Sequence, residues 1–149
     1  MKKIVLLALI VFMNLFGSEL ALQKSFKNAL IQADIVQKPI MFIVSRHTCK
    51  YCVMLEKETL SKDAVIETLN KDYVTYIAYT DDDDDAFPEE FWRPATPTIW
   101  FLDDEGKAMS EPIMGAVDEK NLLKILDTVS KSFAIQKQEQ QINYMKSRL

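Results

Sequence analysis

The sequence predicts one α/β domain in which helices flank a central sheet of about four strands, with an additional helix at the N-terminal end. Three observations predict this fold class. Short apolar runs alternate with segments of helical periodicity, no repeat or linker divides the chain, and its 149 residues suit one domain of ordinary size. Since 48% of the residues are hydrophobic and 10% are aromatic, the chain can build a normal core.

The individual elements follow from periodicity and from the residues that end them. Ile40 to Val44 is a continuous apolar run, typical of a central strand, and Lys38-Pro39 ends the helix before it. Gly106 predicts a hairpin turn, Pro112 suits an edge strand, and Ser61-Lys62-Asp63 is expected to cap a helix. The predicted helices are 20–37, 49–60, 62–70, a short one after Pro88 and one capped by Asp118, and the predicted strands are 40–44, 73–79, 98–102 and 108–114.

Residues 1–17 are predicted to be a secretory signal peptide outside the fold. Lys2-Lys3 is a basic start, Ile4 to Phe16 is almost entirely apolar, and small residues follow. The apolar run is about 13 residues, shorter than the roughly 20 that span a bilayer, so an uncleaved membrane anchor is disfavoured. The expected location is therefore periplasmic or secreted. The folded domain is expected over 18–135, with a polar, helical tail over 136–149.

Cys49-Lys50-Tyr51-Cys52 holds the only two cysteines of the chain. In an oxidising compartment they could form a structural disulfide, but closing so small a loop restrains the unfolded chain little. A zinc site would need two further ligands, and His47 is the only histidine, so no metal is expected. The spacing therefore favours a redox-active dithiol that exchanges disulfides.

The position of Cys49, after a strand and at the start of a helix, favours its thiolate. Helix N-termini carry a partial positive charge, and Lys50 adds a formal one, so the pKa of Cys49 is expected to be lowered. Cys52 follows one helical turn later and should be the more buried, resolving thiol. Leu55 and Glu56 share its helix face. His47 is an active-site neighbour whose protonated form would favour the thiolate further, or else a surface residue of the loop.

Ala95-Thr96-Pro97-Thr98 is the second motif, and with the first it makes residues 20–130 resemble the thioredoxin-like superfamily, in particular its exported members. The resemblance implies a thioredoxin fold with a mixed sheet and a cis Pro97 that faces the dithiol. Because proline lacks an amide hydrogen, the preceding Thr96 is expected to offer its own backbone groups to an extended substrate peptide. Thr96 and Pro97 are thus the predicted substrate-binding residues.

The motif departs from that of cytosolic thioredoxins. Thr48 stands where they have tryptophan before the first cysteine, and Lys50-Tyr51 replaces Gly-Pro. Ile43 occupies the place of their buried aspartate, so the sequence identifies no proton acceptor for Cys52. Tyr51 and Thr96 resemble the corresponding positions of disulfide isomerases and glutaredoxins, although use of glutathione is not expected of an exported protein.

The predicted function is that of an exported oxidoreductase that exchanges disulfides with protein substrates through Cys49 and Cys52. A reductase is favoured, because the chain has no room for the dimerisation domain of an isomerase or the helical insertion of a Dsb-type oxidase. The expected partners are protein thiols and disulfides and an upstream redox partner, a membrane electron donor among the candidates. No cofactor is expected besides the redox-active disulfide. The chain is expected to be monomeric, and its net charge of −4 argues against nucleic acid.

Two alternatives remain open at this stage. One is a non-catalytic thioredoxin-fold binding or adaptor module with a structural disulfide. The other is an adaptor that docks a dedicated partner through the acidic run Asp81 to Asp85 or through residues 136–149. The acidic run is otherwise expected to be a solvated loop, because calcium loops alternate their ligands and place a glycine at the turn.

Overall fold

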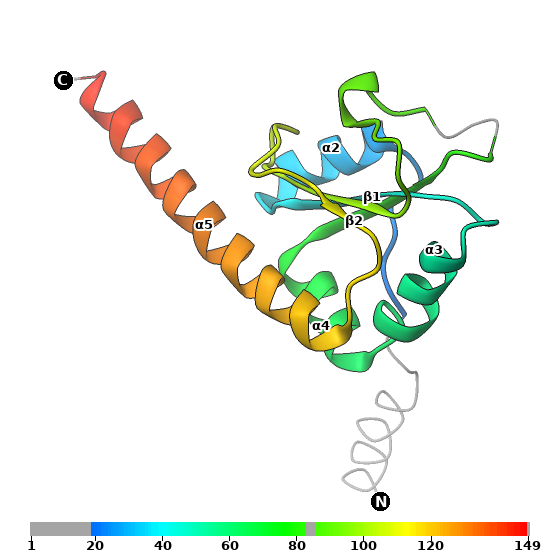
Figure 1. Cartoon of the computed structure of the whole chain (residues 1–149). Coiled ribbons are helices and arrows are strands. Elements are labelled where there is room, and N and C mark those ends of the chain that lie inside the picture. Colours follow the sequence, from blue (N-terminus) through cyan, green and yellow to red (C-terminus); the bar gives the residue numbers. More distant parts are fainter. Residues whose placement is uncertain (1–18, 83–85, 149) are drawn as a thin grey trace, which may run out of the picture.

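The computed structural model describes residues 19–82 and 86–148 (Figure 1). The predicted signal peptide and the last three residues of the acidic run, 83–85, lie outside these residues. Among the residues that are described, no helix combines the length and the apolarity that a membrane span requires.

A four-stranded mixed sheet forms the centre of the molecule, in the order β2-β1-β3-β4. It consists of β1 (Ile40–Ser45), β2 (Val74–Tyr79), β3 (Thr98–Leu102) and β4 (Ile113–Met114). β1 pairs in parallel with β2 and antiparallel with β3, and β4 pairs antiparallel with β3. All six residues of β1 are buried, as expected for a central strand. The predicted fold class is confirmed.

Helices cover both faces of the sheet (Figure 1). α2 (Phe26–Val36) lies on one face, where Phe26 packs against Phe42 of β1 and Phe91. α4 (Asp63–Asp72) and α5 (Glu119–Lys146) contribute to the core on the other face. α3 (Lys50–Met54) continues into a π-helical turn, η1 (Leu55–Thr59), so the predicted helix 49–60 is present with a widened second half. A 3-10 turn, η2 (Glu89–Phe91), follows Pro88.

The N-terminal helix is confirmed, but it begins later than predicted. Ser25 has an extended backbone, and its side chain accepts a hydrogen bond from the amide of Asn28, which makes it the N-cap of α2. The preceding residues lie along the sheet instead. Leu22 forms a bridge with Thr75 of β2, and the amide of Gln23 donates to the Thr75 carbonyl at 2.9 Å. The apolar residues before Ser25 therefore extend the edge of the sheet.

Two further boundaries differ from the predictions. The strand expected over 108–114 pairs regularly only at Ile113–Met114, preceded by an isolated bridge from Ala108 to Leu102, because Pro112 has no amide to donate. The N-cap of α4 is Lys62, whose side chain makes no capping bond, and the Ser61 hydroxyl donates to the Lys57 carbonyl instead.

Other local predictions agree with the structure. Gly106 has φ = 85° in the turn after β3, where a residue without Cβ is favoured. The Asp118 carboxylate caps α5 by accepting the amide of Asn121 at 2.9 Å. α5 then continues to Lys146. It is held against the turn after β3, where Gln136 donates to Asp103 and Lys137 pairs with Asp104.

Candidate active site

Cys49 is the N-cap of α3, immediately after the loop that follows β1. Its sulfur accepts a hydrogen bond from the amide of Cys52 at 3.3 Å, in the role that an oxygen of Ser, Thr or Asp usually plays. The Cys49 carbonyl accepts the amide of Val53, which continues the helix. The end of β1 and the loop after it therefore place the Cys49 sulfur beside the free amides at the start of α3.

Two opposing effects act on the Cys49 thiol. Partial burial raises its pKa, since removal from water disfavours the charged form. Hydrogen bonds from the side chains of Cys52 and Thr96, and from the amides of Cys52 and Tyr51, favour the thiolate and outweigh burial. The net result is a pKa of Cys49 below the ordinary value of 9.0, as the sequence predicts.

Cys52 lies one turn further along α3 and is fully buried. Burial raises the pKa of the Cys52 thiol, and its hydrogen bond to Cys49 raises it further. The two thiols thus differ in the direction that disulfide exchange requires. The more accessible thiol therefore ionises at a lower pH than the buried thiol.

The turn before β3 lies against the dithiol. Antiparallel pairing places Thr98 opposite Val44, near the carboxyl end of β1. The Thr96–Pro97 peptide bond is cis, and the Cys49 thiol donates to the Thr96 carbonyl at 3.3 Å. The Pro97 carbonyl accepts the amide of Gly115, which ties this turn to the chain after β4. Two separate parts of the sequence, residues 49–52 and Thr96, therefore meet at the sulfur of Cys49.

A family model described as the thioredoxin-like domain matches residues 26–130, which include both the dithiol and Thr96-Pro97. The chain belongs to this family. No curated protein matches the chain.

Solved structures with the same fold cover most of the thioredoxin-like domain at low sequence identity. A thioredoxin from Thermus thermophilus has a TM-score of 0.62 and 23% identity, covering 74% of this chain and 86% of its own. The DsbH oxidoreductase has a TM-score of 0.59 and 17% identity, covering 76% and 88%. The oxidised C-terminal domain of DsbD from Neisseria meningitidis has a TM-score of 0.53 and 18% identity, covering 70% and 96%. These likenesses establish the fold.

The remaining predicted neighbours of the dithiol lie on the surface of the thioredoxin-like domain. Lys50 and Tyr51 are exposed at the start of α3. His47 is exposed as well, with its ring stacked on Tyr79 at 3.9 Å between centroids. The hydrogen bond that the His47 imidazole donates to the Asp82 carboxylate raises the pKa of His47, although desolvation opposes this. The contacts that orient the imidazole therefore come from Tyr79 and Asp82.

Asp81 is a site residue that the sequence does not reveal. One carboxylate oxygen accepts the amide of His47 at 3.1 Å, and the other lies 3.4 Å from both the amide and the hydroxyl oxygen of Thr48. Asp81 thus fastens the loop before Cys49 to the end of β2. The sequence shows Asp81 only as part of an acidic run expected to be solvated.

His47 and the two aspartates beside it are also the one group of possible metal ligands in the described part of the chain. His47, Asp81 and Asp82 place one ligand atom each within 4.8 Å of one another. All three residues are exposed, and exposed acidic groups commonly gather without a metal.

A second network that the sequence misses lies beneath the dithiol. The Ser45 hydroxyl at the end of β1 donates to one oxygen of Glu56 at 3.0 Å. The Tyr79 hydroxyl donates to the other oxygen at 3.1 Å. The signal that could have found this network is the spacing of Glu56, four residues after Cys52 and on the same helix face.

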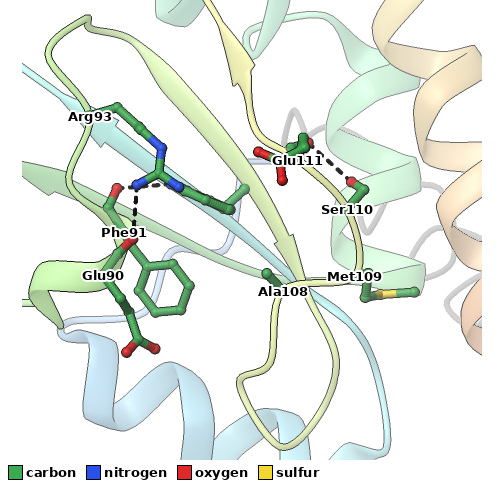
Figure 2. A pocket seen from close by; sticks show the side chains of 8 residues that line it. Glu90, Phe91, Arg93, Ala108, Met109, Ser110 and Glu111 are labelled. Carbon is green, nitrogen blue, oxygen red and sulfur yellow. Dashed lines mark hydrogen bonds between the residues drawn. The ribbon is translucent and has the colours of Figure 1, made fainter.

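A pocket of about 450 Å³ lies away from the dithiol, between the η2 segment and the chain that connects β3 to β4 (Figure 2). Arg93 covers the ring of Trp100 there, 4.5 Å from its centroid, and donates to the carbonyls of Glu90 and Trp92. Because its guanidinium is already bonded to the protein backbone and no thiol lines the pocket, we do not place the redox chemistry there.

Proposed function

We propose that this protein is an exported thiol–disulfide oxidoreductase that acts on protein substrates, with Cys49 as the nucleophile and Cys52 as the resolving thiol. The observation that carries the proposal is the opposite effect of the surroundings on the two thiols. Hydrogen bonds lower the pKa of Cys49, while burial raises that of Cys52. A structural disulfide has no need of this difference.

The surroundings of Cys49 suit an extended peptide as substrate. Thr96 lies against the sulfur, and a peptide that pairs with its backbone would run beside the dithiol. Tyr51 is 58% exposed next to Cys49. Met114, which pairs with Thr98 on the edge strand, is 60% exposed. These apolar side chains offer contacts to substrate residues that flank a disulfide.

For the direction of electron flow we propose reduction of the substrate. The connection between β2 and β3 contains, in its described residues, only the three-residue turn η2, in place of the large helical insertion expected of a Dsb-type oxidase. The DsbD domain of Neisseria meningitidis shares this fold and has been solved in both oxidised and reduced forms. By this proposal the protein works in the periplasm or outside the cell and receives electrons from an upstream redox partner.

The reduction potential of the Cys49–Cys52 pair tests the direction. We expect a value near the thioredoxin end of the range from about −270 to −120 mV, measured by equilibration with a thiol buffer. A value near −120 mV would overturn the reductase assignment and leave the exchange chemistry intact.

The exchange chemistry has its own test. The protein should catalyse the reduction of insulin by dithiothreitol, and Cys49→Ser should abolish catalysis. If Cys49→Ser leaves insulin reduction unchanged, and Cys49 resists alkylation after mild reduction, the protein is a binding module instead of an oxidoreductase.

A further inference from the structure

The last turns of α5 project beyond the thioredoxin-like domain (Figure 1). Phe133 is the last buried residue of this helix, and Lys137 makes its last ion pair with the domain. Among the described residues, no hydrogen bond or ion pair joins the side chains of 138–148 to the domain. Ile142 and Met145 are exposed there. Because a single helical segment of this length is marginal in water, a packing partner would stabilise it.

An apolar groove lies beside the first half of the same helix. It has a volume of about 350 Å³ and separates α5 from the chain that connects β3 to β4. Its apolar lining consists of Phe101, Met109, Ile113, Ile125 and Val129. Among the described residues, Lys124 is the only charged one that lines the groove, and it forms no ion pair. The groove therefore suits an apolar side chain that is accompanied by a carboxylate.

The groove and the projecting turns share one face of α5. Residues that follow one another by three or four positions form a single seam along a helix, as in coiled coils. From the groove outward, this seam consists of Ile125, Thr128, Ser132, Ile135, Glu139, Ile142 and Lys146. The domain leaves the seam uncovered, since Ile135 is 58% exposed and Ile142 is 38% exposed.

We propose that two copies of the chain pair their α5 helices antiparallel along this seam, so that the projecting turns of each copy cover the groove of the other. The seam residues then meet in layers that each occur twice: Ile125 with Ile142, Thr128 with Glu139, and Ser132 with Ile135 of the second copy. The overlap of residues 121–146 is about 40 Å long. Because each chain has one groove and one projecting segment, the two-fold arrangement closes at two copies. The proposal goes beyond the oxidoreductase function and does not rest on it.

The apolar layers fit in this register. Ile142 of the second copy lies opposite Ile125 and so enters the apolar groove. Ser132 is small and exposed, which lets Ile135 of the second copy approach the helix closely. The exposed isoleucines that the domain leaves uncovered are therefore the side chains that the second copy buries.

The charges also match in this register. Glu139 of the second copy lies opposite Thr128, which places it one helical turn from Lys124 in the groove. Lys146 of the second copy lies one turn from the exposed Asp118 at the start of α5. Among the described residues, neither Glu139 nor Lys146 forms an ion pair within its own chain. Opposite charges that lack partners in one chain thus meet across the interface, which favours a second copy as the occupant of the groove.

Sedimentation velocity of the purified protein at concentrations up to about 100 µM, where a weak dimer is still detected, measures the association. We expect the mass of two chains. Ile142→Glu should raise the dissociation constant by about a hundredfold or more, because it places an unpaired charge in both grooves. Tyr144→Glu is the matched control, since Tyr144 is 61% exposed on the opposite face of the same turn. It should change the dissociation constant by less than about twofold. Both residues lie beyond Phe133, so neither substitution disturbs the core of the domain.

Reversal of charges tests the register itself. Lys124→Glu and Glu139→Lys should each raise the dissociation constant by about tenfold, because like charges then meet across the interface. The variant that combines them should return to within about threefold of the unmodified protein, since opposite charges face one another again. Three results overturn the proposal: the monomer expected from the sequence at every concentration, equal dissociation constants for Ile142→Glu and Tyr144→Glu, or a double variant that associates no more tightly than either single one.

Discussion

The Cys49 thiol donates a hydrogen bond to the carbonyl oxygen of Thr96, with sulfur and oxygen 3.3 Å apart. These residues are 47 positions apart in the sequence, and the antiparallel pairing of β1 with β3 brings them together. This contact requires the neutral thiol, because only the thiol has a hydrogen to donate. Once Cys49 ionises, its sulfur has no hydrogen to donate, and the Thr96 carbonyl loses this partner. Under the proposed function, ionisation of Cys49 would thereby free a carbonyl with which a substrate peptide can pair.

The first prediction concerns the reactivity of Cys49 with pH. Burial raises the pKa of Cys49, but hydrogen bonds lower it by more, so the thiolate persists below the ordinary value of 9.0. The thiolate stabilises the reduced state, and this stabilisation is lost as pH falls through the lowered pKa. Alkylation of the reduced protein by iodoacetamide should therefore proceed at Cys49 with a midpoint below 9.0, while Cys52 reacts slowly. Mass spectrometry identifies the modified residue, and Cys49→Ser, the control, should lose the fast phase. A midpoint at or above 9.0 would contradict the assignment of Cys49 as nucleophile.

A second prediction concerns His47, the only histidine of the chain. Its pKa is raised mainly by Asp82, so the pair stabilises the fold below the ordinary value of 6.5, and this contribution disappears as pH rises through the raised pKa. Asp82→Asn should shift the titration midpoint of the imidazole downward, as followed by NMR. Asp34→Asn, at an exposed position on α2, should not shift it. Equal midpoints in Asp82→Asn and the unmodified protein would show that the ion pair does not form in solution.

The parts of the site that local sequence determines were predictable. A cysteine after a buried strand and before a helical pattern is placed at a helix N-terminus whatever the rest of the chain does. The second cysteine then follows on the same face by helical geometry. Thr96-Pro97 was found through family resemblance, because nothing in its local sequence shows that β1 will pair with β3.

The parts that depend on strand register were not predictable. The parallel pairing of β1 and β2 sets Ser45 beside Tyr79, and both then reach Glu56. A shift of one residue would turn these side chains to the other face. Asp81 likewise reaches the loop before Cys49 only because β2 ends beside β1. The late start of α2 at Ser25 has a similar cause, since pairing with β2 outweighs the helical periodicity of the residues before it.

The third prediction tests Asp81 as the tether of the active-site loop. Asp81→Ala should increase hydrogen exchange at the amides of His47 and Thr48 by up to about tenfold, because both lose an acceptor. Desolvation raises the pKa of Asp81, but the hydrogen bonds from backbone amides, together with the charge of His47, lower it by more. The tether is therefore lost only as pH falls through a value below the ordinary 3.8. Hydrogen-exchange mass spectrometry is the measurement. Asp82→Ala, which removes a contact to the His47 ring alone, should leave these amides protected, and equal exchange in both variants would refute the tether.

The fourth prediction concerns the attachment of α5 to the turn after β3. The Lys137 ammonium lies 2.7 Å from the carboxylate of Asp104, whose side chain is 3% exposed, and the other oxygen of that carboxylate has no partner among the described residues. Lys137→Met would leave a buried charge without a cation. Since the Lys137 side chain is itself 32% exposed, we expect a loss of about 2 kcal/mol in the free energy of unfolding, less than for a fully buried pair.

Urea unfolding measures this contribution in the unmodified protein, in Lys137→Met, in Lys131→Met and in the double variant that combines Lys137→Met with Asp104→Asn. Lys131→Met removes an exposed ion pair with Asp127 on the same helix and should change stability by no more than about 0.5 kcal/mol. Adding Asp104→Asn to Lys137→Met removes the unpaired charge and should restore part of the loss, since the cost arises from burying that charge without a partner. If Lys137→Met and Lys131→Met have the same free energy of unfolding, the ion pair of Lys137 with Asp104 does not hold α5 against the turn after β3.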